Sequence, residues 1–192
     1  LATSSAASDV YKRQLLNNLK NCSNNPFDCF EKKFGYKPNL FMKPSEDGSS
    51  IDIFKISNEE DYKKAKLNCL NLEREFIFEE SIEGREFTVT IIGNKCYPVI
   101  EIKTQNDFYD YDAKYISDDT ILDQAKLSDN ELNIINDIAL RAFHALKCSG
   151  WARVDIIQDK NGNFNVIEIN TVPGMTSPVS YTHLTLPTTL QV

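Results

Sequence analysis

Two acids, an amide and an arginine lie at alternating positions in one stretch near the end of the chain. Residues 150–177 read GWARVDIIQDKNGNFNVIEINTVPGMTS. Residues 153–158 and residues 164–170 are apolar-rich runs, and the residues between them have turn composition. This pattern predicts two antiparallel strands joined by a tight turn.

The spacing along these strands predicts a polar site on one face of the hairpin. Side chains alternate between the faces of a strand, so Arg153 shares a face with Asp155, and Glu168 shares one with Asn170. A suitable register brings the four side chains together. Carboxylate and amide oxygens suit a hard cation such as Mg²⁺ rather than zinc, and an arginine offers a fixed fork to an anionic oxygen. The combination indicates phosphate or carboxylate chemistry.

An ordinary hairpin with a solvated polar face is the alternative, and it is favoured if the acidic pattern stands alone. Residues 171–177, TVPGMTS, follow the acids directly. Their Pro-Gly turn redirects backbone amides and hydroxyl groups toward the same place. This neighbouring segment favours the functional interpretation.

The two ends of the chain read as translations of the two strands of one DNA segment, which does not arise by protein evolution. Residues 4–14 can be back-translated into a DNA segment whose reverse complement, read in a shifted frame, gives VSYTHLTLPT, the sequence of residues 179–188. The segment resembles a transposon adaptor used in sequencing libraries. We therefore expect residues 1–14 and 178–192 to be adaptor-derived tails.

Composition narrows the class of protein. The chain has 21 Lys and Arg against 28 Asp and Glu, a net charge of -7, which argues against a nucleic-acid or anionic-membrane partner. Five cysteines without a CxxC pair are typical of reduced thiols in a cytoplasmic protein. One of the two histidines lies in a tail and the other in a helical pattern, so histidine-based metal sites and Ser-His or Cys-His catalysis are excluded for this sequence.

The remaining elements follow from periodicity and capping signals. The spacing of Phe27, Phe30 and Phe34 is compatible with a short amphipathic helix. Further elements are predicted along the chain: strands at 40–43, 51–56, 75–79, 87–92 and 96–102, a helix at about 58–72 after a capping box at 57–60, a polar loop at 105–120, and a helix from a second capping box at 128–131 to about 147.

Three motifs, GWARVD, EINTVPGMTS and the FYDYDAKY of residues 108–115, resemble those of the D-alanine–D-alanine ligases of the ATP-grasp superfamily. The resemblance covers about residues 41–177. It implies an α+β, ATP-grasp fold of antiparallel sheets flanked by helices. It also implies a central subdomain at 41–82 and a C-terminal catalytic subdomain at 83–177, with residues 15–40 as a linker or partial segment.

The resemblance implies a role for each of several side chains. An ATP molecule is expected to be contacted by five residues: Lys43, Ser50 and Lys114 at the phosphates, Glu79 at the adenine amine and Glu86 at the ribose hydroxyls. A Mg²⁺ (or Mn²⁺) ion is expected to be held by Asp155, Glu168 and Asn170. Without the resemblance, the solvated surface charge is at least as good an interpretation for Lys43 and the more frequent one for Glu79 and Glu86.

Four further residues are implied at the reacting centre. Arg153 and the backbone N–H of Gly174 are expected to stabilise a tetrahedral oxyanion. Ser49 and Tyr115 are expected to hydrogen-bond to each other and close the dipeptide site. In this family, a Tyr at this place is the pattern for a D-alanyl-D-alanine product rather than a depsipeptide.

The activity implied is ATP-dependent ligation of two D-alanines through an acyl phosphate, for peptidoglycan precursor synthesis in the cytoplasm. Nucleic acid and membrane are not expected as partners, and complete members of the family are expected to be homodimers. We expect the 192-residue chain to lack the amino-terminal domain and the extreme C-terminus, and so to bind ATP at best. Another ATP-grasp carboxylate–amine ligase and a nucleotide-binding module without catalysis stay open as alternatives.

Overall fold

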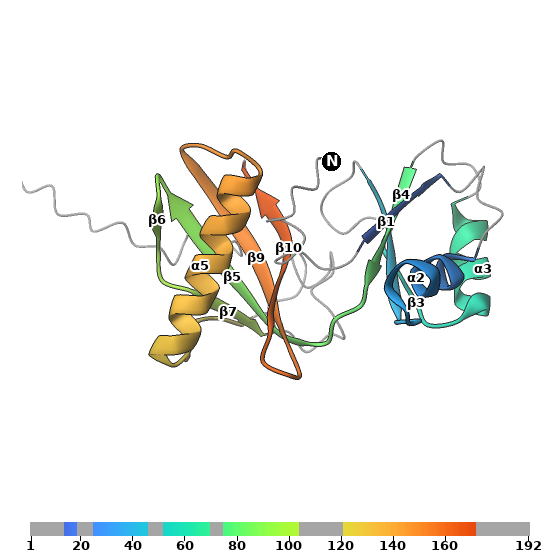
Figure 1. Cartoon of the computed structure of the whole chain (residues 1–192), viewed down its shortest axis with the longest axis horizontal. Helices are drawn as coiled ribbons and strands as arrows, with labels where there is room; N and C mark the ends of the chain where they lie inside the picture. Colours follow the sequence, from blue (N-terminus) through green and yellow to red (C-terminus); the bar gives the residue numbers. More distant parts are fainter. Residues whose placement is uncertain (1–13, 19–24, 46–51, 70–74, 104–120, 172–192) are drawn as a thin grey trace, which may run out of the picture. The chain divides into compact units, whose positions relative to one another are not determined.

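A computed structural model describes residues 14–18, 25–45, 52–69, 75–103 and 121–171. The described residues divide into two compact units, one from residue 14 to residue 82 and one from residue 83 to residue 171 (Figure 1). Each unit has its own cluster of buried hydrophobic side chains.

The first unit is a four-stranded antiparallel sheet with the strand order β1-β4-β2-β3. Residues of both helices join residues of β2, β3 and β4 in one buried cluster, so both helices pack on the same face of this sheet. Its elements are as follows: β1 Gln14–Asn18, α2 Pro26–Phe34, β2 Leu40–Pro44, β3 Phe54–Ile56, α3 Glu59–Asn68 and β4 Glu75–Glu80. Residues 15–40, expected to be a linker or partial segment, thus contain a strand of this sheet and a helix of its core.

Alternation along the strands separates the core face of the first sheet from its other face. Leu40 and Met42 of β2 are fully buried in the helix-packed core. Their neighbour Lys43 therefore points to the opposite face. The same alternation in β4 buries Phe78 against the helices and places Glu79 on the face of Lys43.

The local signals predict the two helices of this unit unequally well. The helix expected from the phenylalanine spacing is confirmed as α2, which begins after Asn25 and ends at Gly35, whose φ of 86° is the left-handed conformation that glycine adopts readily. Helix α3 is confirmed, but its N-cap is Asn58, so the capping box expected to start at Ser57 is wrong. The helix also ends earlier than expected, at Asn68.

The second unit is a six-stranded antiparallel sheet with the order β10-β9-β5-β7-β8, in which β6 pairs with β5. Helix α5 packs across β5, β9 and β10 (Figure 1). Its elements are as follows: β5 Gly84–Ile92, β6 Lys95–Cys96, β7 Ile100–Lys103, β8 Ile121–Gln124, α5 Asp129–Ala145, β9 Trp151–Asp159 and β10 Phe164–Asn170. The single strand expected at 96–102 is divided into β6 and β7.

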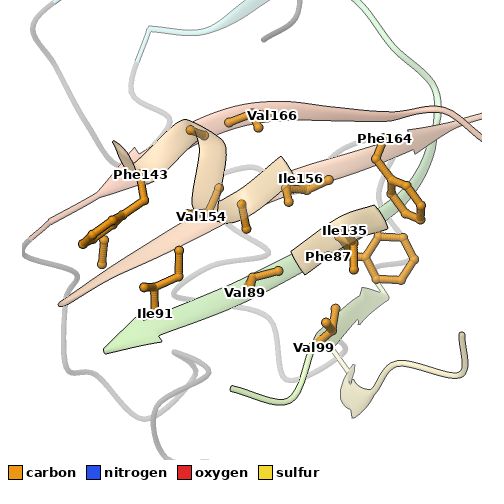
Figure 2. Close-up of a cluster of buried hydrophobic side chains, with 13 residues drawn as sticks. Phe87, Val89, Ile91, Val99, Ile135, Phe143, Val154, Ile156, Phe164 and Val166 are labelled. Atoms are coloured by element: carbon orange, nitrogen blue, oxygen red, sulfur yellow. The ribbon is translucent and has the colours of Figure 1, made fainter. Parts of the chain in front are cut away.

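The core of the second unit lies between the sheet and α5. Phe87 and Val89 of β5 and Val154 and Ile156 of β9 are fully buried against the helix (Figure 2). Since neighbouring side chains of a strand point to opposite faces, the polar residues between these four lie on the other face of the sheet. Helix α5 is fixed at its start by the predicted capping box of Ser128, in which both reciprocal hydrogen bonds form.

Candidate active site

The predicted hairpin is β9 and β10, and its register brings the predicted metal-binding residues together. Glu168 lies opposite Asp155, and Asn170 lies opposite Arg153. Residues that lie directly opposite each other in an antiparallel pair have their side chains on the same face. The face is the one turned away from α5, because Val154 of β9 points into the core.

A β-bulge in β10 makes this arrangement possible. Val166 pairs with Ile156 in the core-facing register, yet Glu168 pairs with Asp155, so the register shifts between Val166 and Glu168. Without the extra residue, Glu168 would lie opposite Val154 and point into the apolar core. The bulge therefore moves the carboxylate and the following amide of Asn170 onto the polar face.

Asp155 is the centre of the hydrogen-bond network on this face. Its Oδ1 accepts from the Oγ1 of Thr88 at 2.7 Å and from the Nε of Arg153 at 2.9 Å. Its Oδ2 accepts from the Nη2 of Arg153 at 2.8 Å and from the Nδ2 of Asn170 at 3.1 Å. The guanidinium thus binds the carboxylate in a two-bond fork, the strongest geometry for this pair.

The carboxyl group of Asp155 is under opposing electrostatic influences. Burial raises its pKa above the usual value, the positive Arg153 lowers it, and the neighbouring Glu168 raises it again. Burial is the largest of these, so the pKa is raised. A site that raises the pKa of an acid by burying it beside a second acid also favours a bound cation, which removes the repulsion between them.

The side chains on this face fit a hard cation by their chemistry. The Nδ2 of Asn170 donates to both carboxylates, at 3.1 Å to Asp155 and 3.2 Å to Glu168, so the two carboxylates converge on one amide nitrogen. A cation in place of that amide N–H group would meet carboxylate oxygens from both sides. Rotation of the Asn170 amide would turn its oxygen toward the same point and complete an all-oxygen set.

The part of the chain that the structure describes contains no metal site built from three or more His, Cys, Asp or Glu side chains. The predicted set contains only two such residues, and its third donor is the amide of Asn170. The donor chemistry therefore points to a cation that prefers oxygen.

Lys43 and Glu79, the predicted phosphate and adenine contacts, form an ion pair within the first unit. The Nζ of Lys43 lies 2.7 Å from the Oε1 of Glu79, with 21% of the lysine side chain and 2% of the glutamate side chain exposed. Neither residue is a solvated surface charge. The burial of Glu79 therefore excludes a solvated charge at this position, while its contact with adenine stays a prediction.

Glu86, the predicted ribose contact, lies on the polar face of the second sheet. It pairs with Ile157 of β9 and is two residues before Thr88, so its half-buried side chain shares the face of Asp155. Five of the predicted residues therefore share one face of this sheet: Glu86, Arg153, Asp155, Glu168 and Asn170. The others predicted for the site lie outside the described residues: Ser49, Ser50, Lys114, Tyr115 and Gly174.

Thr88 is the member of this network that the sequence did not identify. It occurs in the strand predicted at residues 87–92, and its hydroxyl bonds to a residue 67 positions away. The signal was its place in β5 two residues after Glu86, on the same face. Only the pairing of β5 with β9 shows which side chain it meets.

The class of protein follows from comparison with solved structures. D-alanine–D-alanine ligase from Bacillus anthracis complexed with ATP aligns with a TM-score of 0.68 and 27% identity over 87% of this chain and 51% of that chain. VanG D-Ala:D-Ser ligase from Enterococcus faecalis aligns with a TM-score of 0.72 and 29% identity over 90% of this chain and 51% of that chain. The fold is therefore the α+β, ATP-grasp fold of these ligases, as predicted.

The particular family follows from the sequence. The family model described as D-ala D-ala ligase C-terminus matches residues 11–189, and the chain belongs to this family. It is 40% identical over 139 residues to D-alanine--D-alanine ligase of Mannheimia succiniciproducens. The match covers 72% of this chain and 45% of that protein, so the chain spans less than half the length of this relative. Among the helices that the structure describes, none has the length and hydropathy to span a bilayer.

Proposed function

We propose that the complete protein, of which this chain spans part, ligates two D-alanines to D-alanyl-D-alanine with ATP. The observation that carries the proposal is the convergence of Arg153, Asp155, Glu168 and Asn170 on one sheet face in a chain of this family. Relatives named as D-alanine ligases and a neighbour complexed with ATP support the substrate and the nucleotide.

The chemistry explains why such a reaction needs these groups. A carboxylate resists attack by an amine because it is anionic and has no good leaving group. Transfer of a phosphoryl group from ATP gives an acyl phosphate, which an amine attacks readily. A Mg²⁺ (or Mn²⁺) ion held by Asp155, Glu168 and Asn170 supplies charge neutralisation at the phosphates.

The remaining roles belong to this chain's own side chains. Lys43, Lys114 and Ser50 contact the phosphates, Glu79 the adenine amine and Glu86 the ribose hydroxyls. Arg153 and the N–H of Gly174 stabilise the oxyanion that forms when the second D-alanine attacks. Ser49 and Tyr115 close the dipeptide site. The complete protein acts in the cytoplasm as a homodimer, in peptidoglycan precursor synthesis.

The test removes one metal-binding carboxylate at a time from the complete protein. Asp155→Asn and Glu168→Gln keep the shape of each side chain and remove its charge. We expect each to lower D-alanine-dependent ADP release by at least about 100-fold, more than the loss of a residue that only orients a metal ligand. Asp137→Asn, at an exposed acid of α5, is the matched control and should leave the rate unchanged. Near-normal turnover in either of the first two variants contradicts the metal assignment.

A second candidate is an ATP-grasp ligase that joins D-alanine to a different second substrate. The alignment with a D-Ala:D-Ser ligase at a TM-score of 0.72 favours keeping this candidate. Assays of the complete protein with D-alanine, D-serine and D-lactate as second substrate separate the two. We expect D-alanine to give the highest kcat/KM, because Tyr115 occupies the position that the family associates with the dipeptide product.

A further inference from the structure

The Asp155 carboxylate has all its acceptor positions filled by protein donors. An ionised carboxylate offers about four lone-pair positions on its two oxygens. Thr88 and the Nε of Arg153 occupy the positions of Oδ1, and the Nη2 of Arg153 with the amide of Asn170 occupies those of Oδ2. A cation that binds this carboxylate must therefore replace at least one of the donors.

The donors differ in whether they are compatible with a cation at Asp155. The guanidinium of Arg153 is positive and is repelled by a metal ion that approaches the same oxygens. The amide of Asn170 must rotate, because a metal ligand presents its oxygen and this amide presents its N–H group to both carboxylates. Thr88 is neutral and binds Oδ1, so its hydrogen bond can persist while Oδ2 faces Glu168 and the cation.

Thr88 is also held firmly in place. It lies opposite Asp155 in the pairing of β5 with β9, and β5 has strands on both sides. Only 2% of Thr88 is exposed. A β-branched side chain in a strand has few alternative rotamers, so its hydroxyl group is fixed relative to the neighbouring strand. Its 2.7 Å bond therefore holds Oδ1 of Asp155 in place.

We propose that Thr88 is a positioning residue that holds Oδ1 of Asp155, so that Oδ2 is presented together with Glu168 and Asn170 to the cation. The inference rests on the proposed function, since it takes the metal assignment as given. It adds a residue of β5, a strand outside the hairpin, to the residues that prepare the proposed cation site. Loss of the hydroxyl weakens cation binding without removing a ligand.

The experiment measures Mn²⁺ binding directly, by electron paramagnetic resonance, to the complete protein with a non-hydrolysable ATP analogue. Thr88→Val removes the hydroxyl and keeps the shape, and we expect it to raise the Mn²⁺ Kd about tenfold, the lower range for loss of a group that orients a metal ligand. Thr88→Ser keeps the hydroxyl and should stay within about twofold of the parent. Thr90→Val is the matched control, because Thr90 lies on the same face of β5 and is equally buried, but it faces Arg153.

A second variant without the hydroxyl separates the loss of the hydrogen bond from a folding defect that Thr88→Val alone could cause. Thr88→Ala places no methyl group against the carboxylate and should show the same loss of Mn²⁺ affinity as Thr88→Val. Saturating Mg²⁺ should restore most of the kcat of both variants, because the ligands themselves remain. A purely structural role would lower kcat at every metal concentration.

The outcomes separate this inference from the proposed function. If the parent binds Mn²⁺ no better than Asp155→Asn, the metal assignment fails and the role of Thr88 fails with it. If the parent binds Mn²⁺ through Asp155 but Thr88→Val or Thr88→Ala binds as tightly as the parent, only the positioning role is overturned. Equal losses in Thr88→Val and Thr90→Val also overturn it.

Discussion

The ion pair of Lys43 and Glu79 shows how one contact can serve both the fold and a proposed ligand. A carboxylate with 2% of its side chain exposed is stable in a protein only when partners compensate for the water it has lost. Lys43, at 2.7 Å, is one such partner. The lysine that is proposed to meet a phosphate therefore already compensates a charge within its own sheet.

Variants at this pair separate its structural part from its proposed role in nucleotide binding. Lys43→Met should lower the free energy of unfolding of the first unit by about 3 kcal/mol, because it leaves Glu79 buried without its lysine. The double variant Lys43→Met with Glu79→Met should recover most of this stability but should not recover binding of an ATP analogue. Hydrogen exchange of the β2 and β4 amides and titration calorimetry measure the two effects.

A surface pair provides the control for this prediction. Lys64 and Glu60 of α3 form an ion pair with 68% and 77% of their side chains exposed. Lys64→Met should change the stability of the unit by less than about 0.5 kcal/mol, as exposed pairs contribute little. Equal effects of Lys64→Met and Lys43→Met would show that burial of Glu79 is not what makes the inner pair matter.

Gly84 is required by the close approach of two strands. It begins β5 opposite Asp159 of β9, and a Cβ atom at this position would overlap the carbonyl oxygen of Gln158. Gly84→Ala should therefore destabilise the second unit by about 2–3 kcal/mol, since a backbone atom cannot move aside easily. Gly162→Ala in the hairpin turn is the comparison: its Cβ meets no atom within 4 Å, and only the φ of 86° opposes it. Thermal unfolding should show a loss of only about 1 kcal/mol for Gly162→Ala, and equal losses would contradict the steric argument.

At the scale of elements, local signals in the sequence predicted most strands and helices. They did not predict the β-bulge that brings the site residues onto one face. The limits of β10 and the capping box of α5 follow from neighbouring residues, and both are confirmed. The bulge after Val166 does not, because unbroken alternation along β10 would keep Glu168 on the face of Val166. The contact of Thr88 with Asp155 likewise depends on a pairing of distant strands. The division of residues 15–177 into subdomains stays a prediction.

A second polar network ties several elements of the second unit together on the helix side of the sheet. The Nε of Arg85 in β5 donates to Glu101 in β7 at 2.8 Å, and the ring of Phe87 lies beneath the guanidinium at 4.9 Å. Gln158 of β9 donates to Glu131 in the first turn of α5 at 3.3 Å. Glu101, with 8% of its surface exposed, is the most buried charge of this network.

The pH dependence of stability should reveal the contribution of Glu101. The hydrogen bond from Arg85 is the main cause that lowers the pKa of Glu101 below its usual value of 4.5. A lowered pKa means that the carboxylate stabilises the fold above about pH 4.5 and that this stabilisation is lost as pH falls through the folded-state pKa. Because 42% of the Arg85 side chain is exposed, solvent screens the pair, and we expect Glu101→Gln to cost about 1 kcal/mol at pH 7.

Urea unfolding of this chain, followed by the fluorescence of its one tryptophan, Trp151 in β9, measures this difference. The gap between the parent and Glu101→Gln should shrink as pH is lowered from 7 to below 4.5. Asp137→Asn is the control, because Asp137 and Arg141 of α5 form a pair with 66% and 44% of their side chains exposed. A gap that is the same at all pH values would indicate lost packing rather than a lost charge.

At the scale of the whole molecule, the proposed contacts are divided between the two units. Lys43 and Glu79 belong to the first unit, and Glu86, Asp155 and Glu168 belong to the second, so neither unit carries the full set. The chain spans 45% of the Mannheimia relative and about half of the aligned solved structures. The ligase activity therefore stays a proposal for the complete protein.

The last prediction compares this chain with the protein encoded by the extended reading frame. Sequencing the source DNA across residues 14 and 178 should show a frame that continues on both sides with residues other than those of the two tails. We expect the extended protein to release phosphate from ATP only when D-alanine is present, and the 192-residue chain to release none, because an acyl phosphate forms only where nucleotide and first substrate are held together. An ATP analogue should still bind the shorter chain if the contacts of Lys43, Glu79 and Glu86 suffice. D-alanine-dependent phosphate release by the shorter chain would instead place the entire catalytic set within it.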